Sequence, residues 1–305
     1  DCQISVWNST INIKDYESKI LVKRANDGYD DVRQEYNDKV LHENLSKGQN
    51  AIRKQIFITM TIKAPDNEVA QRKFNTIDLE TKNSFERIGN TNLRPLSNQE
   101  RIELLKDVFV GADVAIPKLT KEDIDKGLDK VYCAPDYFEF KSDYFMFGEF
   151  YAKCVFIKEY PSTANDNILN DLIASNIQML VTTNVFAHDT AEARKLVQRQ
   201  ITAIETNMAQ RESAAAKAGN FSAQMPVKFR NQIESYKGLY DMLTVNDQKL
   251  FSVATIIMVM AKDYDKLKTN MEVVASALKR NGCMYGEMKW QQEDGMCDVL
   301  PIGTQ

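Results

Sequence analysis

The run FSVATIIMVMA, residues 251–261, is the longest apolar run of the chain. Its β-branched side chains predict a buried strand. Asp263 follows, then a helical pattern that stops at RNG (280–282), a short extended piece, and QQE at 291–293. This segment therefore predicts a strand, an N-capped helix, a glycine stop, a second strand and a second helix.

The same order occurs earlier in the chain. The run IFITMTI, residues 56–62, precedes Asp66, a helical pattern, RIG at 87–89, a short extended piece and NQE at 98–100. The earlier helix is longer by about four residues, which is one helical turn. We interpret the two copies as a duplication, which predicts two similar α/β lobes.

The second lobe is expected over residues 147–305. Its predicted elements are strand 148–158, helix 166–174, strand 177–187, a helical pair within 189–243, strand 249–261, helix 263–281, strand 283–288 and a final short helix. Without the helical insertion the order is βαββαβ. The fold class predicted for both lobes is therefore α+β, with ferredoxin-like (split βαβ) lobes, helical insertions and antiparallel or mixed sheets.

The first lobe is expected over residues 1–110. It comprises strand 2–8, a charged helical insertion at 12–48, strand 53–63, helix 66–88, strand 91–95 and a helix opened by a capping box at Ser97 and Glu100. The insertion is expected to be a helix–turn–helix broken near residues 26–28. Its first strand and helix would lie upstream of Asp1, so we expect an open sheet edge here. Residues 111–146, rich in aromatics, are expected to connect the lobes.

Composition excludes several classes of protein. The 305 residues are 43% apolar and 27% charged with a net charge of −4, which gives no overall attraction to nucleic acid or anionic lipid. The cysteines are scattered and form no CxxC, which favours a reduced, cytosolic setting with cysteines in the core. No apolar run reaches the roughly 20 residues of a transmembrane helix. The five cysteines are Cys2, Cys133, Cys154, Cys283 and Cys297.

No motif assigns a catalytic, cofactor-binding or metal-binding residue. The chain has no GxxxxGK[ST] phosphate loop. The stretch IIMVMAKD, 256–263, is faintly similar to a Walker B strand, but Asp263 is better explained as a helix N-cap, like Asp66. Glu100 and Glu293 are explained by first-turn positions of helices.

The two histidines are weak candidates. His188 and Asp189 lie at a strand-to-helix turn, where a histidine could act as a general base. No Ser or Cys elbow accompanies them in the sequence, so a capping role is favoured. His42 lies in a charged helical segment. The stretch RESAAAKAGN, 211–220, reads as an exposed hairpin tip suited to docking.

Three stretches resemble a known family: NAIRKQIFITMT (50–61), LSNQERIELLKDVF (96–109) and EDGMCDVLPIG (293–303). They are similar to the amino-terminal region of the VirB-four/TraE-like conjugation ATPases of type IV secretion systems, most of all those of Gram-positive conjugative elements. In that family a short helix and Leu-Pro-Leu-Gly lead into the ATPase domain, and LPIG at 300–303 resembles this exit.

The resemblance implies a non-catalytic assembly and docking domain. ATP and Mg would bind in a downstream domain that this chain lacks. The implied partners are membrane components of the conjugation channel, the coupling ATPase and neighbouring copies, at the inner face of the cell membrane. Two alternatives are a stand-alone hydrolytic enzyme with acids in an inter-lobe cleft and a nucleic-acid-binding module. Convergent desolvated acids would favour the enzyme, and salt-dependent binding of single-stranded DNA would favour the nucleic-acid module.

Overall fold

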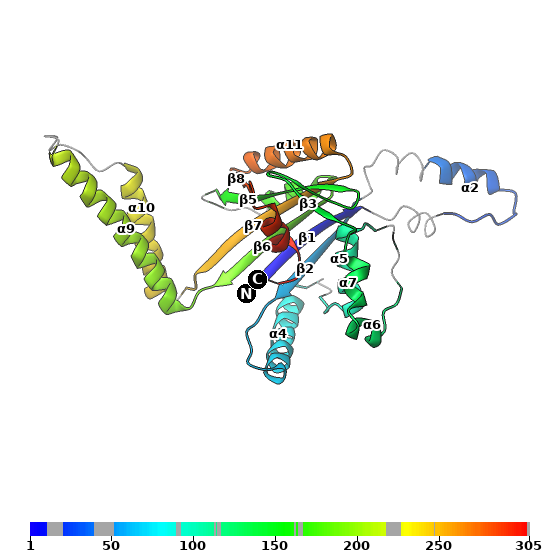
Figure 1. Cartoon of the computed structure of the whole chain (residues 1–305), viewed down its shortest axis with the longest axis horizontal. Helices are drawn as coiled ribbons and strands as arrows, with labels where there is room; N and C mark the ends of the chain where they lie inside the picture. Colours follow the sequence, from blue (N-terminus) through cyan, green and yellow to red (C-terminus); the bar gives the residue numbers. More distant parts are fainter. Residues whose placement is uncertain are drawn as a thin grey trace. The chain divides into compact units, whose positions relative to one another are not determined.

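The computed structural model describes residues 1–10, 21–39, 52–89, 93–112, 114, 117–161, 163, 167–217, 227–246 and 248–303. The strands are β1 (Cys2–Thr10), β2 (Ile52–Met60), β3 (Phe138–Phe140), β4 (Phe145–Phe147), β5 (Phe150–Glu159), β6 (Met179–Ala187), β7 (Phe251–Ala261) and β8 (Met284–Glu287). The helices are α2 (Asp30–Tyr36), α4 (Asn67–Ile88), α5 (Asn98–Phe109), α6 (Lys121–Asp125), α7 (Leu128–Cys133), α8 (Asn167–Ala174), α9 (Thr190–Lys217), α10 (Val227–Thr244), α11 (Tyr264–Arg280) and α12 (Gln292–Val299). Figure 1 shows their arrangement.

All eight strands belong to one sheet. Their order is β2-β1-β6-β7-β5-β4-β3, and β8 also pairs with β5. The pairs β1–β2, β3–β4, β4–β5, β5–β7 and β5–β8 are antiparallel. The predicted α+β class with an antiparallel sheet is therefore confirmed. The detail of two ferredoxin-like lobes is not confirmed, because β1 and β2 share a sheet with strands expected in the second lobe.

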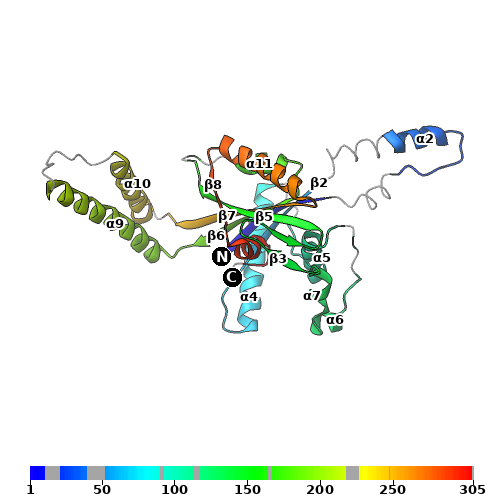
Figure 2. The same ribbon diagram turned by 45° about the horizontal axis from the view of Figure 1, so that its top comes forward.

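Side chains of the central strands alternate between two apolar cores. On β7, Ile257, Val259 and Ala261 pack with α8 and α11 on one face. Ile256, Met258 and Met260 lie on the other face, with residues of α5 and α12. This follows from the two-residue period of a strand, and both faces are apolar because helices cover both. Figure 2 shows α11 above the sheet and α5 and α12 below it.

The chain divides into two compact units. One holds residues 185–253, and the other holds 2–184 with 254–305. In the first unit α9 and α10 lie side by side (Figures 1 and 2) around a small core of Ala193, Val197, Ile201 and Leu243. The boundaries expected at residues 110 and 146 stay predictions.

Helix starts follow their predicted caps. The Asp66 side chain accepts from the Val69 N–H at 2.8 Å, and Asp263 caps α11 in the same way. Ser97 and Glu100 form the predicted capping box of α5. These caps satisfy backbone donors that have no partner inside the helix. The reading of Asp263 as a cap, in preference to a Walker B acid, agrees with this geometry.

Three local predictions differ from the structure. Leu93–Pro95, the described part of the expected strand 91–95, forms no strand. The aromatic segment expected to be an irregular connection contains two helices, α6 and α7, and the hairpin of β3 and β4. Within the insertion at 12–48, the expected break near residues 26–28 is present, since Asn26 and Gly28 have φ angles of 55° and 86°. The helix expected before the break is absent from residues 21–25, and Asp30–Tyr36 is the α-helix among the described residues of this insertion. Residues 12–20 and 40–48 lie outside the described residues.

The last residues of α12 and the segment after them are hydrogen-bonded to the sheet. Asn184 donates to the Asp298 carbonyl at 3.2 Å, and the Thr182 hydroxyl donates to the Val299 carbonyl. The Thr59 hydroxyl approaches the Pro301 carbonyl at 3.4 Å. Strands β2 and β6, far apart in sequence, therefore hold the same short stretch of chain.

None of the helices in the described ranges combines the length and the apolar content that crossing a bilayer would demand.

Candidate docking surface

Strand β2 lies at one end of the sheet. Among the described residues it pairs only with β1, in a register that runs from Cys2 opposite Met60 to Thr10 opposite Ile52. Its other edge therefore presents backbone N–H and C=O groups with which no described strand pairs. An open edge was expected in this part of the chain.

The two faces of β2 differ. Phe57 packs on the core beside α5 and α12, whereas Ile56, Ile58 and Met60 point to the opposite face. Ile56 is 69% exposed, a high value for an aliphatic side chain in a strand. The opposite face of β2 is therefore apolar and incompletely covered.

Helix α4 borders this face. It is 22 residues long, yet none of its residues is buried. A helix usually gains most of its stability from packing one face against the protein. Because α4 packs so little, its apolar side chains remain available; Phe74 is 41% exposed and Leu79 is 60% exposed.

A groove of about 450 Å³ lies between β2 and α4. Ile58 and Met60 form its sheet side, and Phe74 and Ile77 stand among the α4 residues opposite. The remaining lining residues are Gln71, Asn75, Asp78, Thr81, Leu93, Arg94 and Pro95. The groove combines apolar walls with a few polar groups, which is typical of binding sites.

Arg94 is fixed at this groove by Glu100. Its guanidinium donates two hydrogen bonds to the carboxylate, at 2.9 and 2.5 Å. The Ser97 N–H donates to the same carboxylate at 2.9 Å. Arg94, with help from Ser97, lowers the pKa of Glu100 to about 2. Glu100 therefore acts as a helix cap and an anchor for Arg94, which agrees with its sequence interpretation.

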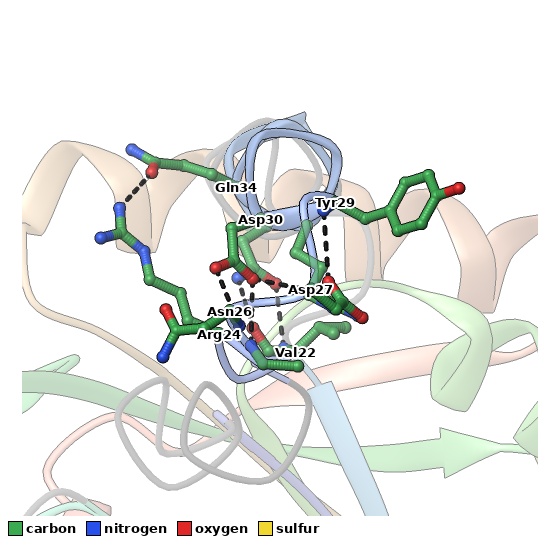
Figure 3. A network of polar contacts seen from close by, with 10 residues as sticks. Val22, Arg24, Asn26, Asp27, Tyr29, Asp30 and Gln34 are labelled. Carbon is green, nitrogen blue, oxygen red and sulfur yellow. Dashed lines mark hydrogen bonds and ion pairs between the residues drawn. The ribbon is translucent and has the colours of Figure 1, made fainter.

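A second apolar surface is carried by α2, whose loop is held by a polar network (Figure 3). The Asp30 carboxylate accepts from the N–H groups of Ala25 at 3.0 Å and Asn26 at 3.1 Å. Arg33 donates to Asp27 with both terminal nitrogens at 2.5 Å. The hydrogen bonds from Arg33 lower the pKa of Asp27 to about 2.

Beside this network, α2 and its N-terminal flank carry three exposed apolar side chains. Tyr29, Val32 and Tyr36 recur at helical spacing and are all exposed. In Figure 3 the Tyr29 ring points away from the network. The polar contacts thus organise the loop without covering these apolar side chains.

Trp290 is a third exposed feature. It is 83% exposed and has a φ angle of 63°, which is uncommon for a bulky residue. The backbone N–H of Trp290 donates to the Ser142 carbonyl at 2.7 Å, which holds the backbone in place. Exposed tryptophans are frequent anchors of protein interfaces. Trp290 was not among the candidates predicted from the sequence.

His188 does have a hydroxyl partner. Its Nε2 lies 2.6 Å from the Ser252 hydroxyl on the neighbouring strand. This pair could not be predicted from the sequence, because the two residues are 64 positions apart. Asp189 accepts from the Ala191 N–H at 2.8 Å, as a capping residue does. Ser252 is exposed and His188 is half-buried. Within the described residues no acid is hydrogen-bonded to the His188 ring, so the triad arrangement is not complete there.

The other sequence candidates are spread over the fold. Glu293 is exposed in the first turn of α12. Arg211, at the expected hairpin tip, stacks on the Phe229 ring at 5.0 Å. His42 and residues 218–220 lie outside the described residues. The described ranges contain no group of three or more His, Cys, Asp or Glu side chains placed to hold a metal ion.

No protein-family model matches this chain, and no curated protein matches it.

Proposed function

We propose that this chain is a non-catalytic assembly and docking module of a conjugative type IV secretion ATPase, a machine that powers transfer of DNA and protein across the cell envelope. The observation that carries the docking role is the open edge of β2 beside the groove formed with α4. A strand edge and an apolar groove together provide backbone and side-chain contacts for a partner.

The link to conjugation rests on the sequence resemblance. The three stretches that carry it lie together in the structure. Phe57 of β2, Leu104 of α5, and Val299 and Leu300 at the end of α12 belong to one apolar core. This contiguity supports the view that the resemblance reflects one packed unit and not three unrelated matches.

The resemblance also implies binding partners and a cellular location. Small membrane proteins of the conjugation channel, the coupling ATPase and neighbouring copies would bind this chain at the inner face of the membrane. ATP and Mg would be handled by a domain outside the 305 residues. These assignments follow from the resemblance.

The test measures binding to the membrane partners. The purified chain is mixed with vesicles that carry the membrane components of a conjugation channel, and with empty vesicles. We expect co-sedimentation only with the loaded vesicles, and a loss of at least about tenfold in affinity for Ile56→Lys, which places a charge on the docking surface. Val131→Lys is the matched control, because Val131 is equally exposed (68%) but lies on α7.

Two results would contradict the proposal. One is equal binding to loaded and empty vesicles. The other is hydrolysis of Mg-ATP by the 305-residue chain alone, which would assign catalysis to this part of the protein.

A further inference from the structure

The open edge of β2 is basic. Residues 52–65 contain three cations, Arg53, Lys54 and Lys63, and no acid. In the part of the chain that the structure describes, none of the three has an ion-pair partner. Among the described residues, positive charge without an ion-pair partner therefore lies at the start of β2, on Arg53 and Lys54, and three residues beyond its end, on Lys63.

Between these charges the edge is apolar. Ile56, Ile58 and Met60 share one face, and the last two line the groove beside α4. Successive side chains of an added strand point alternately to the two faces of the sheet. An added strand would therefore direct every second side chain toward this apolar face.

We infer that β2 accepts an extended segment of a partner protein as an additional strand, with apolar side chains at alternate positions and acidic residues at its ends. This inference rests on the proposed docking function and specifies the chemistry of the partner. Main-chain hydrogen bonds to the open edge supply affinity, the groove selects apolar side chains, and the cations select acids.

The charge pattern argues against a second copy of β2 as the occupant. Pairing β2 with itself would bring together two strands that each carry two cations, Arg53 and Lys54, and no acid, with Lys63 close behind each. Like charges brought together at an interface weaken association. A helix is also a poor occupant of the edge, because its own backbone groups are already paired and cannot satisfy those of β2.

The test uses three synthetic peptides of equal length. The first alternates Val and Thr and has two Glu at each end, the second has Lys in place of Glu, and the third is the first with a central Pro. Binding to the full chain is measured by fluorescence anisotropy. We expect the acidic peptide to bind at least about tenfold tighter than the basic one at low salt, with the difference shrinking as salt rises. The proline peptide should bind weakly, since proline cannot donate to the ladder.

Variants locate the interaction. The double variant Arg53→Glu/Lys54→Glu should reverse the preference between the acidic and basic peptides. Ile56→Lys should weaken binding of the acidic peptide, whereas Val131→Lys should leave the affinity for this peptide unchanged. Circular dichroism of each variant checks that the fold is retained.

Several results would overturn strand addition. These are equal affinity for acidic and basic peptides, binding of the proline peptide as tight as its parent, no response to charge reversal, or sedimentation showing a dimer that Ile56→Lys dissociates. If the peptides do not bind but the chain still binds the channel components, strand addition is wrong and the proposed function stands. If the chain binds the acidic peptide but does not bind the loaded vesicles, the proposed function is wrong and strand addition stands.

Discussion

The backbone N–H of Gly303 donates to the side-chain oxygen of Gln3 at 2.8 Å, across 300 positions of sequence. The Gln3 amide nitrogen also approaches the Asp298 carbonyl at 3.4 Å. Gln3 is buried on β1, so these groups are shielded from water. One side chain thus joins the first strand of the sheet to the segment that follows α12.

Replacing Gln3 should be costly. In Gln3→Leu the Gly303 N–H loses its partner in a buried place, which is expected to lower the free energy of unfolding by about 1–3 kcal/mol. Chemical denaturation measures the effect. The control is Gln198→Leu, at an exposed position of α9, which should be near neutral. Equal effects of the two changes would show that the Gln3 contact contributes little.

Gly286 on β8 should not tolerate a side chain. A Cβ atom at this position would lie 2.5 Å from the Phe156 ring of the paired strand β5. We expect Gly286→Ala to destabilise the protein by about 1–3 kcal/mol, since overpacking forces neighbours apart. Gly238→Ala is the matched control. Nothing lies within 4 Å of its Cβ position, and alanine favours a helix such as α10. In thermal denaturation, the Tm of Gly238→Ala should therefore lie above that of wild type, and the Tm of Gly286→Ala should lie below it.

Two leucines on helices should differ in how much their replacement lowers stability, because one is buried and the other is exposed. Leu278 on α11 is 1% exposed in the core with α8, whereas Leu79 on α4 is 60% exposed. Leu278→Ala is expected to lower the free energy of unfolding by about 2–5 kcal/mol, through lost burial and a cavity. Leu79→Ala should change it by less than about 0.5 kcal/mol. A large effect at Leu79, measured by urea denaturation, would mean that α4 packs more closely than described.

Glu100 should make the free energy of unfolding depend on pH. Its pKa in the folded protein is about 2, below its ordinary range, because Arg94 and Ser97 favour the carboxylate. A lowered folded-state pKa adds stability that is complete above about pH 5 and is lost as the pH falls toward 2. The difference in unfolding free energy between wild type and Glu100→Gln should therefore narrow over this window.

Arg94→Gln is the companion variant for this prediction. Without the guanidinium, the pKa of Glu100 should move back toward its ordinary range, so the stabilisation should be lost at a higher pH. Parallel pH profiles for wild type and Glu100→Gln would contradict the coupling.

Features with local causes could be predicted from the sequence. Asp66, Asp263 and the Ser97–Glu100 box cap helices through bonds within a few residues, so the pattern contains its own explanation. Strands that need a distant neighbour were harder. Leu93–Pro95 is favoured to be extended because a residue before proline avoids the helical region, yet it has no ladder partner among the described residues and forms no strand.

The candidate docking surface was predictable in part. Alternation along β2 places Ile56 and Ile58 on one face, and an open edge was expected for this part of the chain. The groove itself depends on how far α4 lies from β2, which is a tertiary property that no local pattern contains. The aromatic hairpin of β3 and β4 was missed because each strand has only three residues, too few to show a period.

The bond between Gln3 and Gly303 also bears on biosynthesis. A ribosome must translate 300 further residues before the partner of Gln3 exists. Until then the Gln3 side-chain oxygen lacks the Gly303 N–H, whereas Ser5 of the same strand can already bond to Thr182. The nascent chain therefore carries β1 without this contact while the residues up to Gly303 are made, and incompletely packed strands of this kind are the species that chaperones protect.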